Sequence, residues 1–446
     1  MQSEYDNCTE RGKRLISPVI LDVYSTCGYL FSNMKTEITI SSPLMGCSVY
    51  RRWINTVLFL LALLQSSCAE LSVREVSDPA EAISRLKSGG TLKNEIDTLV
   101  NPLICSGENV SAVVGVVMPD SRTYVYGYGK TELDTGSTPD GRTIYSIGSV
   151  SKGFVSLLLF RMMEEGVIGK NETIGDILGP DFKPEDENVA SITLIQLATH
   201  SSGLPRHPQT IKLLCSFSSF LFTGNNFYEY IDSTEGIKYL NGVHLDKEQI
   251  GKYIYSNVGV GLLGYLLAKK ADKSLTELLQ EKIFRPLKMK DTAITLNDEQ
   301  KNRLAVAYSG DQPLFRLRNT PLEPWKFTYF MEGTGAVYST ADDLLLFIKA
   351  QLGFQTASPL GSIIPKTQQK QVDAEKLNVA SGWFVEKPFQ DSHEIYYQYG
   401  LTSGFNCYLG FDREQKIGVV VLRNNFNWRD KIGHNLILRI AGSIQN

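Results

Sequence analysis

The sequence predicts an α+β fold in which one antiparallel sheet, built from N- and C-terminal segments, is flanked by helices and interrupted by a mostly helical region. Residues 112–129 contain two β-rich runs around a Pro-Asp-Ser turn, which indicates a hairpin. Residues 405–411 and 417–422 flank the sequence DREQK and indicate a second hairpin near the other end. Helical periodicity is found between and beside them, at residues 152–165, 194–199, 258–271 and 341–352.

This order of elements places a functional site where the sheet meets the helices. Residues 224–251 contain polar and aromatic stretches between glycines without clean periodicity, so we expect a loop at the rim of that site. The sheet part is expected at about 90–150 and 325–446, and the helical part at about 151–324.

The composition is that of an ordinary globular protein. Of 446 residues, 42% are hydrophobic and 21% are charged, which excludes a disordered chain. The formal charge of -3 and the absence of a long basic run in the main body argue against nucleic-acid binding.

Cysteine and histidine positions give no support for a metal or another cofactor. Only Cys105, Cys215 and Cys407 lie in the main body, far apart and without a C-x-x-C pair. The five histidines form no H-x-x-x-H cluster. We therefore expect an enzyme or binding protein without a metal or cofactor.

The first 69 residues differ from the rest and are expected to form an N-terminal extension ahead of a domain at 70–446. Arg51 and Arg52 precede an apolar run at 53–64, and small residues follow, an order typical of a secretory signal peptide. The run is short for a membrane span, which needs about 20 apolar residues. A true start at Met45 would put the signal at the N-terminus.

The sequence therefore predicts export, with the protein in the periplasm or anchored on the outer face of the membrane. Two alternatives to signal cleavage remain open. Cys68 could carry a lipid, or the apolar run could stay uncleaved as a short anchor.

The sequence YSIGSVSKGFVSL at 145–157 contains a candidate nucleophile, Ser149, three residues before Lys152. If a helix begins at Ser149, the hydroxyl and the amine lie on one face and can touch. A neutral amine could then take the serine proton. Alternatively, Ser149 only caps the helix. The tetrapeptide alone is weak evidence for a nucleophile, because Ser-x-x-Lys also occurs at 32–35 and 84–87.

A partner for the serine is expected in a Tyr-x-Asn sequence, which occurs at 239–241 and 255–257. The second copy opens YSNVGVGLLGYLLAKKA, where a packed helix would hold the tyrosine rigidly. We therefore choose Tyr255 and Asn257 as the candidate pair.

Six blocks in order carry a family resemblance: YSIGSVSKGF, ITLIQLATHSSGLP, YSNVGVGLLGYLL, IFRPLKMKDT, GAVYSTADDLLLF and GFNCYLGFD. Together they resemble the serine β-lactamase-related family, which holds class C β-lactamases and penicillin-binding D-Ala-D-Ala carboxypeptidases, and within it the branch of AmpH type. The resemblance covers about residues 90–440, and its specificity lies in the ordered set of blocks.

The resemblance implies a role for each matching residue. Ser149 would be the acylated nucleophile and Lys152 its base. Tyr255 would pass a proton to the leaving amine and help activate the deacylating water, and Asn257 would orient Lys152 and the substrate carbonyl. The backbone N–H groups of Ser149 and Leu401 would form the oxyanion hole.

The third motif departs from the family pattern. The family has Lys-Thr-Gly or His-x-Gly here, whereas this chain has Gln398-Tyr399-Gly400. By resemblance, Gln398, Gly400 and Thr402 line the substrate, but glutamine offers hydrogen bonds without the charge that normally meets a substrate carboxylate. His393 has the opposite strand parity and is not expected to replace that cation.

Two other motifs have simpler interpretations. His200 lacks a G-x-S-x-G frame around its serine neighbours and is expected to be a packed histidine that holds a turn. Arg206 follows that turn and is an alternative anion-binding group. Asp342 and Asp343 are expected to be first-turn acids of a helix.

The sequence thus predicts an exported serine hydrolase that acts through an acyl-enzyme on β-lactams or D-Ala-containing cell-wall peptides. The missing cation keeps two alternatives open. One is an esterase or D-amino-acid amidase of the same fold, and the other is a penicillin or muropeptide sensor that acylates without turnover.

Overall fold

The structure is a computed structural model that describes residues 91–355, 358–374, 377–388, 393–427 and 432–444. The expected signal segment at 53–64 and Cys68 lie outside the described residues. Their roles remain predictions.

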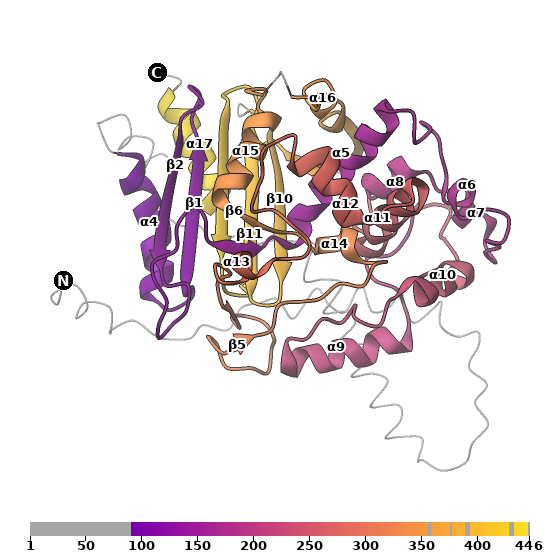
Figure 1. The fold of residues 1–446 in the computed structure, drawn as a ribbon, viewed down its shortest axis with the longest axis horizontal. Helices are drawn as coiled ribbons and strands as arrows, with labels where there is room; N and C mark the ends of the chain where they lie inside the picture. Colours follow the sequence, from indigo (N-terminus) through magenta and orange to yellow (C-terminus); the bar gives the residue numbers. More distant parts are fainter. Residues whose placement is uncertain (1–90, 356–357, 375–376, 389–392, 428–431, 445–446) are drawn as a thin grey trace, which may run out of the picture. The chain divides into compact units, whose positions relative to one another are not determined.

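The described chain is organised around an eight-stranded antiparallel sheet with the strand order β2-β1-β12-β11-β10-β9-β8-β7 (Figure 1). Its strands are β1 (Ser111–Val117), β2 (Thr123–Gly129), β7 (Lys370–Ala374), β8 (Leu377–Ala380), β9 (Trp383–Glu386), β10 (Ile395–Thr402), β11 (Phe405–Asp412) and β12 (Ile417–Arg423). Strands from the two ends of the domain meet where β1 pairs with β12. The predicted α+β class is therefore confirmed.

Both predicted hairpins are present. β1 pairs with β2 and places Val114 opposite Tyr126, while β11 pairs with β12 and places Leu409 opposite Val420. The strands of the second hairpin are buried along their whole length, because helices cover both faces of the sheet there.

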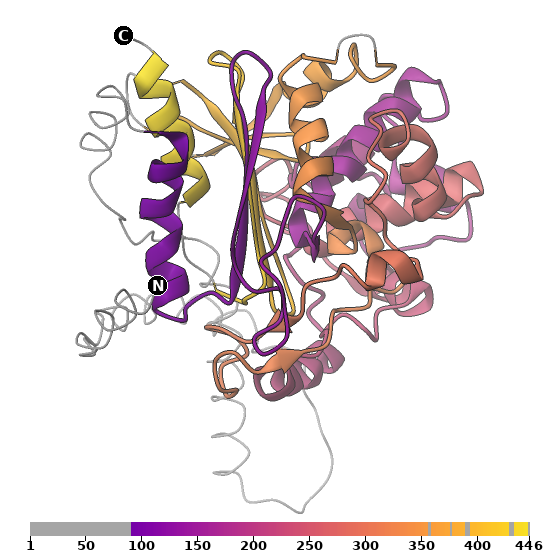
Figure 2. The ribbon, with the colours of Figure 1, turned by 60° about the vertical axis from the view of Figure 1, so that its left-hand side comes forward.

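One face of the sheet is covered by α4 (Leu92–Cys105) and α17 (Ile432–Ile444), the first and last described helices (Figure 2). Leu99 of α4 and Leu436 of α17 join Val116 and Val421 of the sheet in one core cluster. Each such side chain contributes about 1.5–3 kcal/mol when it is fully buried. The two ends of the domain are therefore held together by apolar packing on one sheet face.

The opposite face meets α15 and the helical region, which runs from α5 onward (Figure 2). The longer helices here are α5 (Ser151–Glu164), α9 (Ile211–Thr223), α10 (Ser233–Gly242), α11 (Asn257–Ala271) and α15 (Ala341–Gln351). Shorter ones are α6 (Ile174–Leu178), α7 (Glu187–Ala190), α8 (Leu194–Ala198), α12 (Leu275–Leu279), α13 (Asp298–Lys301), α14 (Glu332–Gly335) and α16 (Ile364–Thr367). The four helices expected from periodicity correspond to α5, α8, α11 and α15.

Two small ladders connect the helical region to the sheet. β3 (Ile144–Ser146) pairs with β6 (Tyr338–Thr340), and β4 (Ala307–Tyr308) pairs with β5 (Pro321–Leu322). The first ladder leads directly into the segment that carries Ser149.

The expectation of a loop throughout 224–251 is wrong, because α10 lies inside it. The Asp232 side chain caps this helix by accepting from the Glu235 N–H at 2.9 Å. Only Gly236 and Leu240 of α10 are buried, so the helix has no wide apolar stripe that periodicity could detect.

Asp342 and Asp343 lie in the first turn of α15, as predicted. Thr340 caps the helix by accepting from the Asp343 N–H at 3.2 Å. The Asp343 carboxylate in turn accepts from Asp291 N and Thr292 Oγ1, both at 2.7 Å, and so fixes a neighbouring loop.

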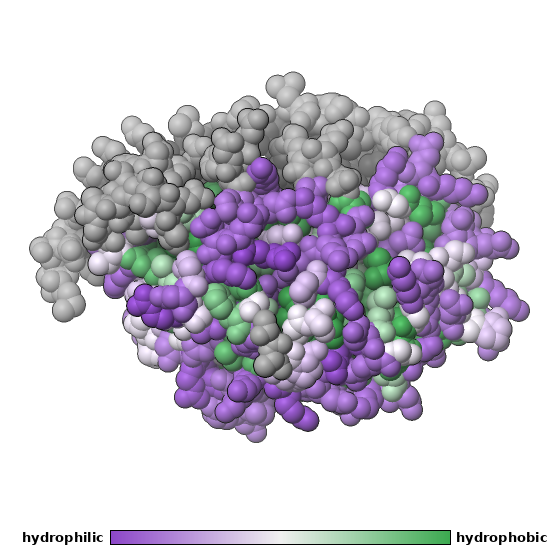
Figure 3. Space-filling view, turned by 90° about the horizontal axis from the view of Figure 1, so that it is seen from above, coloured by the Kyte–Doolittle hydropathy of each residue, from purple (hydrophilic) through white to green (hydrophobic). Residues whose placement is uncertain are grey.

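Within the described ranges, no helix combines the length and the apolar character needed to cross a membrane. The face shown in Figure 3 is mainly hydrophilic, with apolar side chains in separate small areas.

Candidate active site

Ser149 lies in a tight turn between β3 and α5. The chain passes through Gly148 at φ +50 into the 3₁₀ turn η1 (Gly148–Val150), and α5 follows without a break. A Cβ at Gly148 would lie 2.6 Å from Leu401 N, so the turn can approach β10 only with glycine there. This approach brings the serine to the edge of the sheet.

Lys152 is one helical turn beyond Ser149, and its side chain is fully buried. Its Nζ donates to Ser149 Oγ at 2.9 Å and to the Thr334 carbonyl at 2.7 Å. Burial lowers the pKa of the Lys152 amine well below its usual value, and the charge of Arg206 lowers it further. In its neutral form, the amine can instead accept the Ser149 hydroxyl proton across the same distance and act as a base.

Tyr255 approaches Ser149 from the loop that enters α11. Its hydroxyl donates to Ser149 Oγ at 2.8 Å. The His200 ring packs on the Tyr255 ring at 4.4 Å, and His200 Nδ1 accepts from Ser256 N at 3.1 Å. Burial lowers the pKa of His200 to about 3, so this histidine is neutral and packs as predicted.

Asn257, the first residue of α11, contacts Tyr228 and Thr334. Its Nδ2 donates to the Tyr228 hydroxyl at 2.8 Å, and that hydroxyl is 2.5 Å from His207 Nδ1. The carbonyl of Asn257 accepts from Thr334 Oγ1 at 2.8 Å, and the Thr334 carbonyl accepts from Lys152. Asn257 is thus linked to Lys152 through Thr334, and its role in orienting Lys152 and the substrate carbonyl stays a prediction.

The edge of β10 lies against the nucleophile turn. β9 pairs with β10 only at 395–397, and Thr402 pairs with Phe405 at the turn into β11. By the alternation of an antiparallel ladder, the N–H of Leu401 then points away from β11. A Cβ at Gly400 would lie 1.8 Å from the Ile147 carbonyl, so glycine permits this contact.

The other third-motif side chains are occupied with structural hydrogen bonds. Gln398 is 1% exposed, and its Nε2 donates to the Gly382 carbonyl at 2.9 Å. Its Oε1 has no hydrogen-bond partner among the described residues. Thr402 Oγ1 donates to Ser146 Oγ at 3.0 Å. His393 lies beside Glu414 and outside β10.

The sequence did not single out Thr334, Tyr228 or His207 as parts of the site. Thr334 contributes a backbone carbonyl, which has no residue-type signal. Arg206 was noted only as an alternative anion-binding group, but its Cζ lies 4.8 Å from the centroid of the Tyr255 ring. The block ITLIQLATHSSGLP, just before Arg206, was the available signal.

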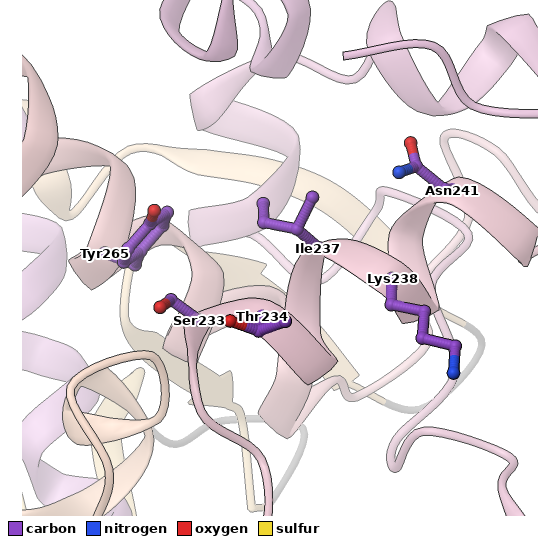
Figure 4. A pocket seen from close by; sticks show the side chains of 6 residues that line it. All are labelled: Ser233, Thr234, Ile237, Lys238, Asn241 and Tyr265. Carbon is purple, nitrogen blue, oxygen red and sulfur yellow. The ribbon is translucent and has the colours of Figure 1, made fainter. Parts of the chain in front are cut away.

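A separate pocket of about 440 Å³ lies between α10 and Tyr265 of α11 (Figure 4). It is lined by Ser233, Thr234, Ile237, Lys238, Asn241 and Tyr265. None of the residues around Ser149 is among them. Over the described stretches of chain, no group of three His, Cys, Asp or Glu side chains is placed to hold a metal ion.

Comparisons with known proteins identify the family to which the chain is similar. The family model described as Beta-lactamase matches residues 96–442. The D-alanyl-D-alanine-carboxypeptidase/endopeptidase AmpH of Escherichia coli K12 is 25% identical over 355 residues, which cover 76% of this chain and 86% of that protein. A beta-lactamase of Yersinia enterocolitica is 22% identical over 371 residues, covering 74% and 87%.

Solved structures share the fold. A D-alanine carboxypeptidase AmpC from Burkholderia cenocepacia has a TM-score of 0.64 at 24% identity, covering 79% of this chain and 99% of that one. A class C beta-lactamase has a TM-score of 0.66 at 19% identity, covering 80% and 97%. The family-model match over residues 96–442 shows that this chain belongs to the beta-lactamase family, and together with the named relatives it shows that the chain is a serine hydrolase.

Proposed function

We propose that this protein hydrolyses amide bonds of β-lactams or D-Ala-containing peptidoglycan peptides through an acyl-enzyme at Ser149. The main support is that Ser149 Oγ lies 2.9 Å from the fully buried Lys152 amine and 2.8 Å from the Tyr255 hydroxyl. A serine held between a base and a proton donor fits acyl transfer. The names of the relatives, a carboxypeptidase/endopeptidase and a beta-lactamase, agree with these substrates.

Acylation would begin when the Lys152 amine takes the proton of Ser149. The serine oxygen forms a bond to the substrate carbonyl carbon, and the developing oxyanion is held by the N–H groups of Ser149 and Leu401. The Tyr255 hydroxyl gives its proton to the leaving nitrogen as the C–N bond breaks, and the proton on Lys152 restores Tyr255. Water then attacks the ester by the same steps in reverse order.

The test is intact mass measured over time after benzylpenicillin is added to the wild type and to Ser149→Ala. We expect a mass increase of one penicillin that decays as product is released, and no adduct on the variant. An adduct that persists would favour the sensor alternative. Labelling that survives in Ser149→Ala would overturn the assignment of the nucleophile.

An esterase or amidase of the same fold is the second candidate function, because Gln398 gives strand β10 no cation. Such an enzyme would cleave a neutral p-nitrophenyl ester and leave benzylpenicillin unbound. The wild type assayed with both substrates distinguishes these functions.

Export is proposed on the sequence alone, from the arginines before the apolar run at 53–64 and the small residues after it. N-terminal sequencing of the secreted or membrane-bound protein would locate the cleavage site. A new N-terminus near 66–69 supports cleavage, and an intact extension in the cytoplasmic fraction contradicts export.

A further inference from the structure

The groups around Tyr255 differ in whether they carry charge. Burial lowers the pKa values of Lys152, His200 and His207 below their usual values and so disfavours their charged forms. Arg206 is different because a guanidinium stays protonated in proteins. Of these four nitrogen bases, Arg206 is therefore the permanent cation.

Arg206 is held firmly beside the reacting groups. Its backbone carbonyl accepts from Asn257 N at 3.0 Å, and the Pro205 carbonyl accepts from Ser256 Oγ at 2.8 Å. These bonds fix the turn after His200 to the start of α11. From there the Arg206 guanidinium carbon reaches to 4.8 Å from the centroid of the Tyr255 ring.

The side chain is suited to meet an anion from solvent. Arg206 is partly exposed, whereas Gln398 is buried. A guanidinium can pack against an aromatic ring through its face and bind a carboxylate through its edge. The cation is thus accessible on the Tyr255 side of the nucleophile, and the β10 side offers none at position 398.

We propose that Arg206 binds the substrate carboxylate in this enzyme and so takes over the role that a third-motif cation would have. The inference rests on the proposed function, in which Tyr255 protonates the leaving nitrogen. In both penicillins and D-Ala-D-Ala peptides, the carboxylate is on the carbon next to that nitrogen. A cation beside Tyr255 therefore lies on the side of the site where this carboxylate is expected. The preferred substrates are amides whose leaving group carries a carboxylate.

A purely supporting role for Arg206 is the competing explanation. The cation lies over the Tyr255 ring and lowers the pKa of Lys152, so it could act on these two residues alone. In that case its loss would slow charged and neutral substrates equally. The two explanations therefore predict different ratios of the rate on a charged substrate to the rate on a neutral one, although both allow a lower rate on either substrate alone.

The experiment compares benzylpenicillin with its methyl ester, which has the same reacting amide without the carboxylate. Acylation of Ser149 is measured by mass on the wild type, Arg206→Gln and Arg206→Lys, each on the plateau of its pH profile. On this plateau the rate no longer depends on pH, so a shifted Lys152 pKa in a variant does not affect the comparison. Arg142→Gln is the matched control, because that side chain is 63% exposed beside Glu299 and loses the same charge at the surface.

For Arg206→Gln, we expect the acylation rate constant kcat/KM to fall about 10- to 100-fold on the acid and less than about threefold on the ester. The kcat/KM of Arg206→Lys on the acid should lie between those of the wild type and Arg206→Gln, since a lysine keeps the charge but loses the planar guanidinium. Arg142→Gln should leave the ratio unchanged.

If Arg206→Gln leaves the acid-to-ester ratio of kcat/KM unchanged, whether or not both rates fall, the proposal is overturned while the Ser149 assignment stays intact. A wild type that forms no adduct with either compound would overturn the proposed function as well.

Discussion

The two sides of Ser149 differ in how completely they match the chemistry of the family. On the helical side, Lys152, Tyr255 and the Thr334 carbonyl form a connected set around the nucleophile. On the sheet side, β10 keeps the close backbone approach at Gly400 but has a buried amide at Gln398. In the proposed mechanism, proton transfer and charge recognition are thus separate tasks, and one can change while the other is retained.

The difference follows from what each side requires. The base of the proposed mechanism must be neutral, and burial favours this by lowering the pKa of the Lys152 amine well below its usual value. A carboxylate-binding group must stay charged and reach solvent, which the buried position 398 does not favour without a partner. The partly exposed Arg206 meets that requirement on the opposite side.

The largest expected effect is on the helical side, with Lys152→Met. Removing the amine takes away the base, so kcat/KM for acylation should fall by about 10⁴-fold. The kcat/KM of Lys152→Arg should fall by a similar factor, because a guanidinium keeps its proton. Stopped-flow acylation with a chromogenic β-lactam measures both, and an active Arg variant would show that the lysine is only structural.

Lys152 should also leave a signature in stability. Its folded pKa is lowered below the usual 10.5, so below pH 10.5 the unfolded chain binds the extra proton and stability rises with pH toward that value. The wild type should therefore gain stability as the pH rises toward 10, relative to Lys152→Met. Urea unfolding of both proteins at several pH values tests this, and parallel pH dependences would contradict a buried neutral amine.

The next largest effect is expected on the sheet side, at the close approach of Gly400 to the nucleophile turn. Gly400→Ala would place a Cβ 1.8 Å from the Ile147 carbonyl and push β10 away from η1. Losing the Leu401 donor to the oxyanion should reduce kcat about 10²- to 10³-fold. Gly242→Ala is the control, since a Cβ at Gly242 meets nothing within 4 Å. Equal activity of both variants would exclude this edge from the oxyanion hole.

Tyr255→Phe should have a smaller effect, about 10²-fold, because the variant keeps the ring packing on His200 and loses only the hydroxyl. The loss should be greater for an amide than for a p-nitrophenyl ester, whose leaving group needs no proton. Parallel assays of the two substrates measure this difference. An equal loss on both would argue against proton delivery to the leaving atom.

Gln398→Met should have the smallest effect. The change loses the bond to the Gly382 carbonyl but also removes the Oε1 atom that has no described partner, so the cost of the first is partly offset by the gain from the second. We expect kcat/KM on benzylpenicillin to change less than about threefold. A loss comparable with that of Arg206→Gln would return the carboxylate-binding role to β10.

The sequence by itself determined the features that depend on neighbours along the chain. The three-residue spacing of Ser149 and Lys152 places both on one helical turn, and the hairpins follow from strand patterns around short turns. The order of the six blocks identified the family. Expectations failed where local pattern was weak, as in α10, which is held by a cap and few buried residues.

Only the tertiary structure decided the electrostatics of the site. Tyr255 reaches Ser149 and Thr334 reaches Lys152 from segments far along the chain, and burial there lowers the pKa of the Lys152 amine. The contact of Asn257 with Tyr228 and the position of Arg206 over the Tyr255 ring likewise arise from packing between distant loops. Residue type specifies what a side chain can do, but its charge state and partner depend on which distant residues surround it.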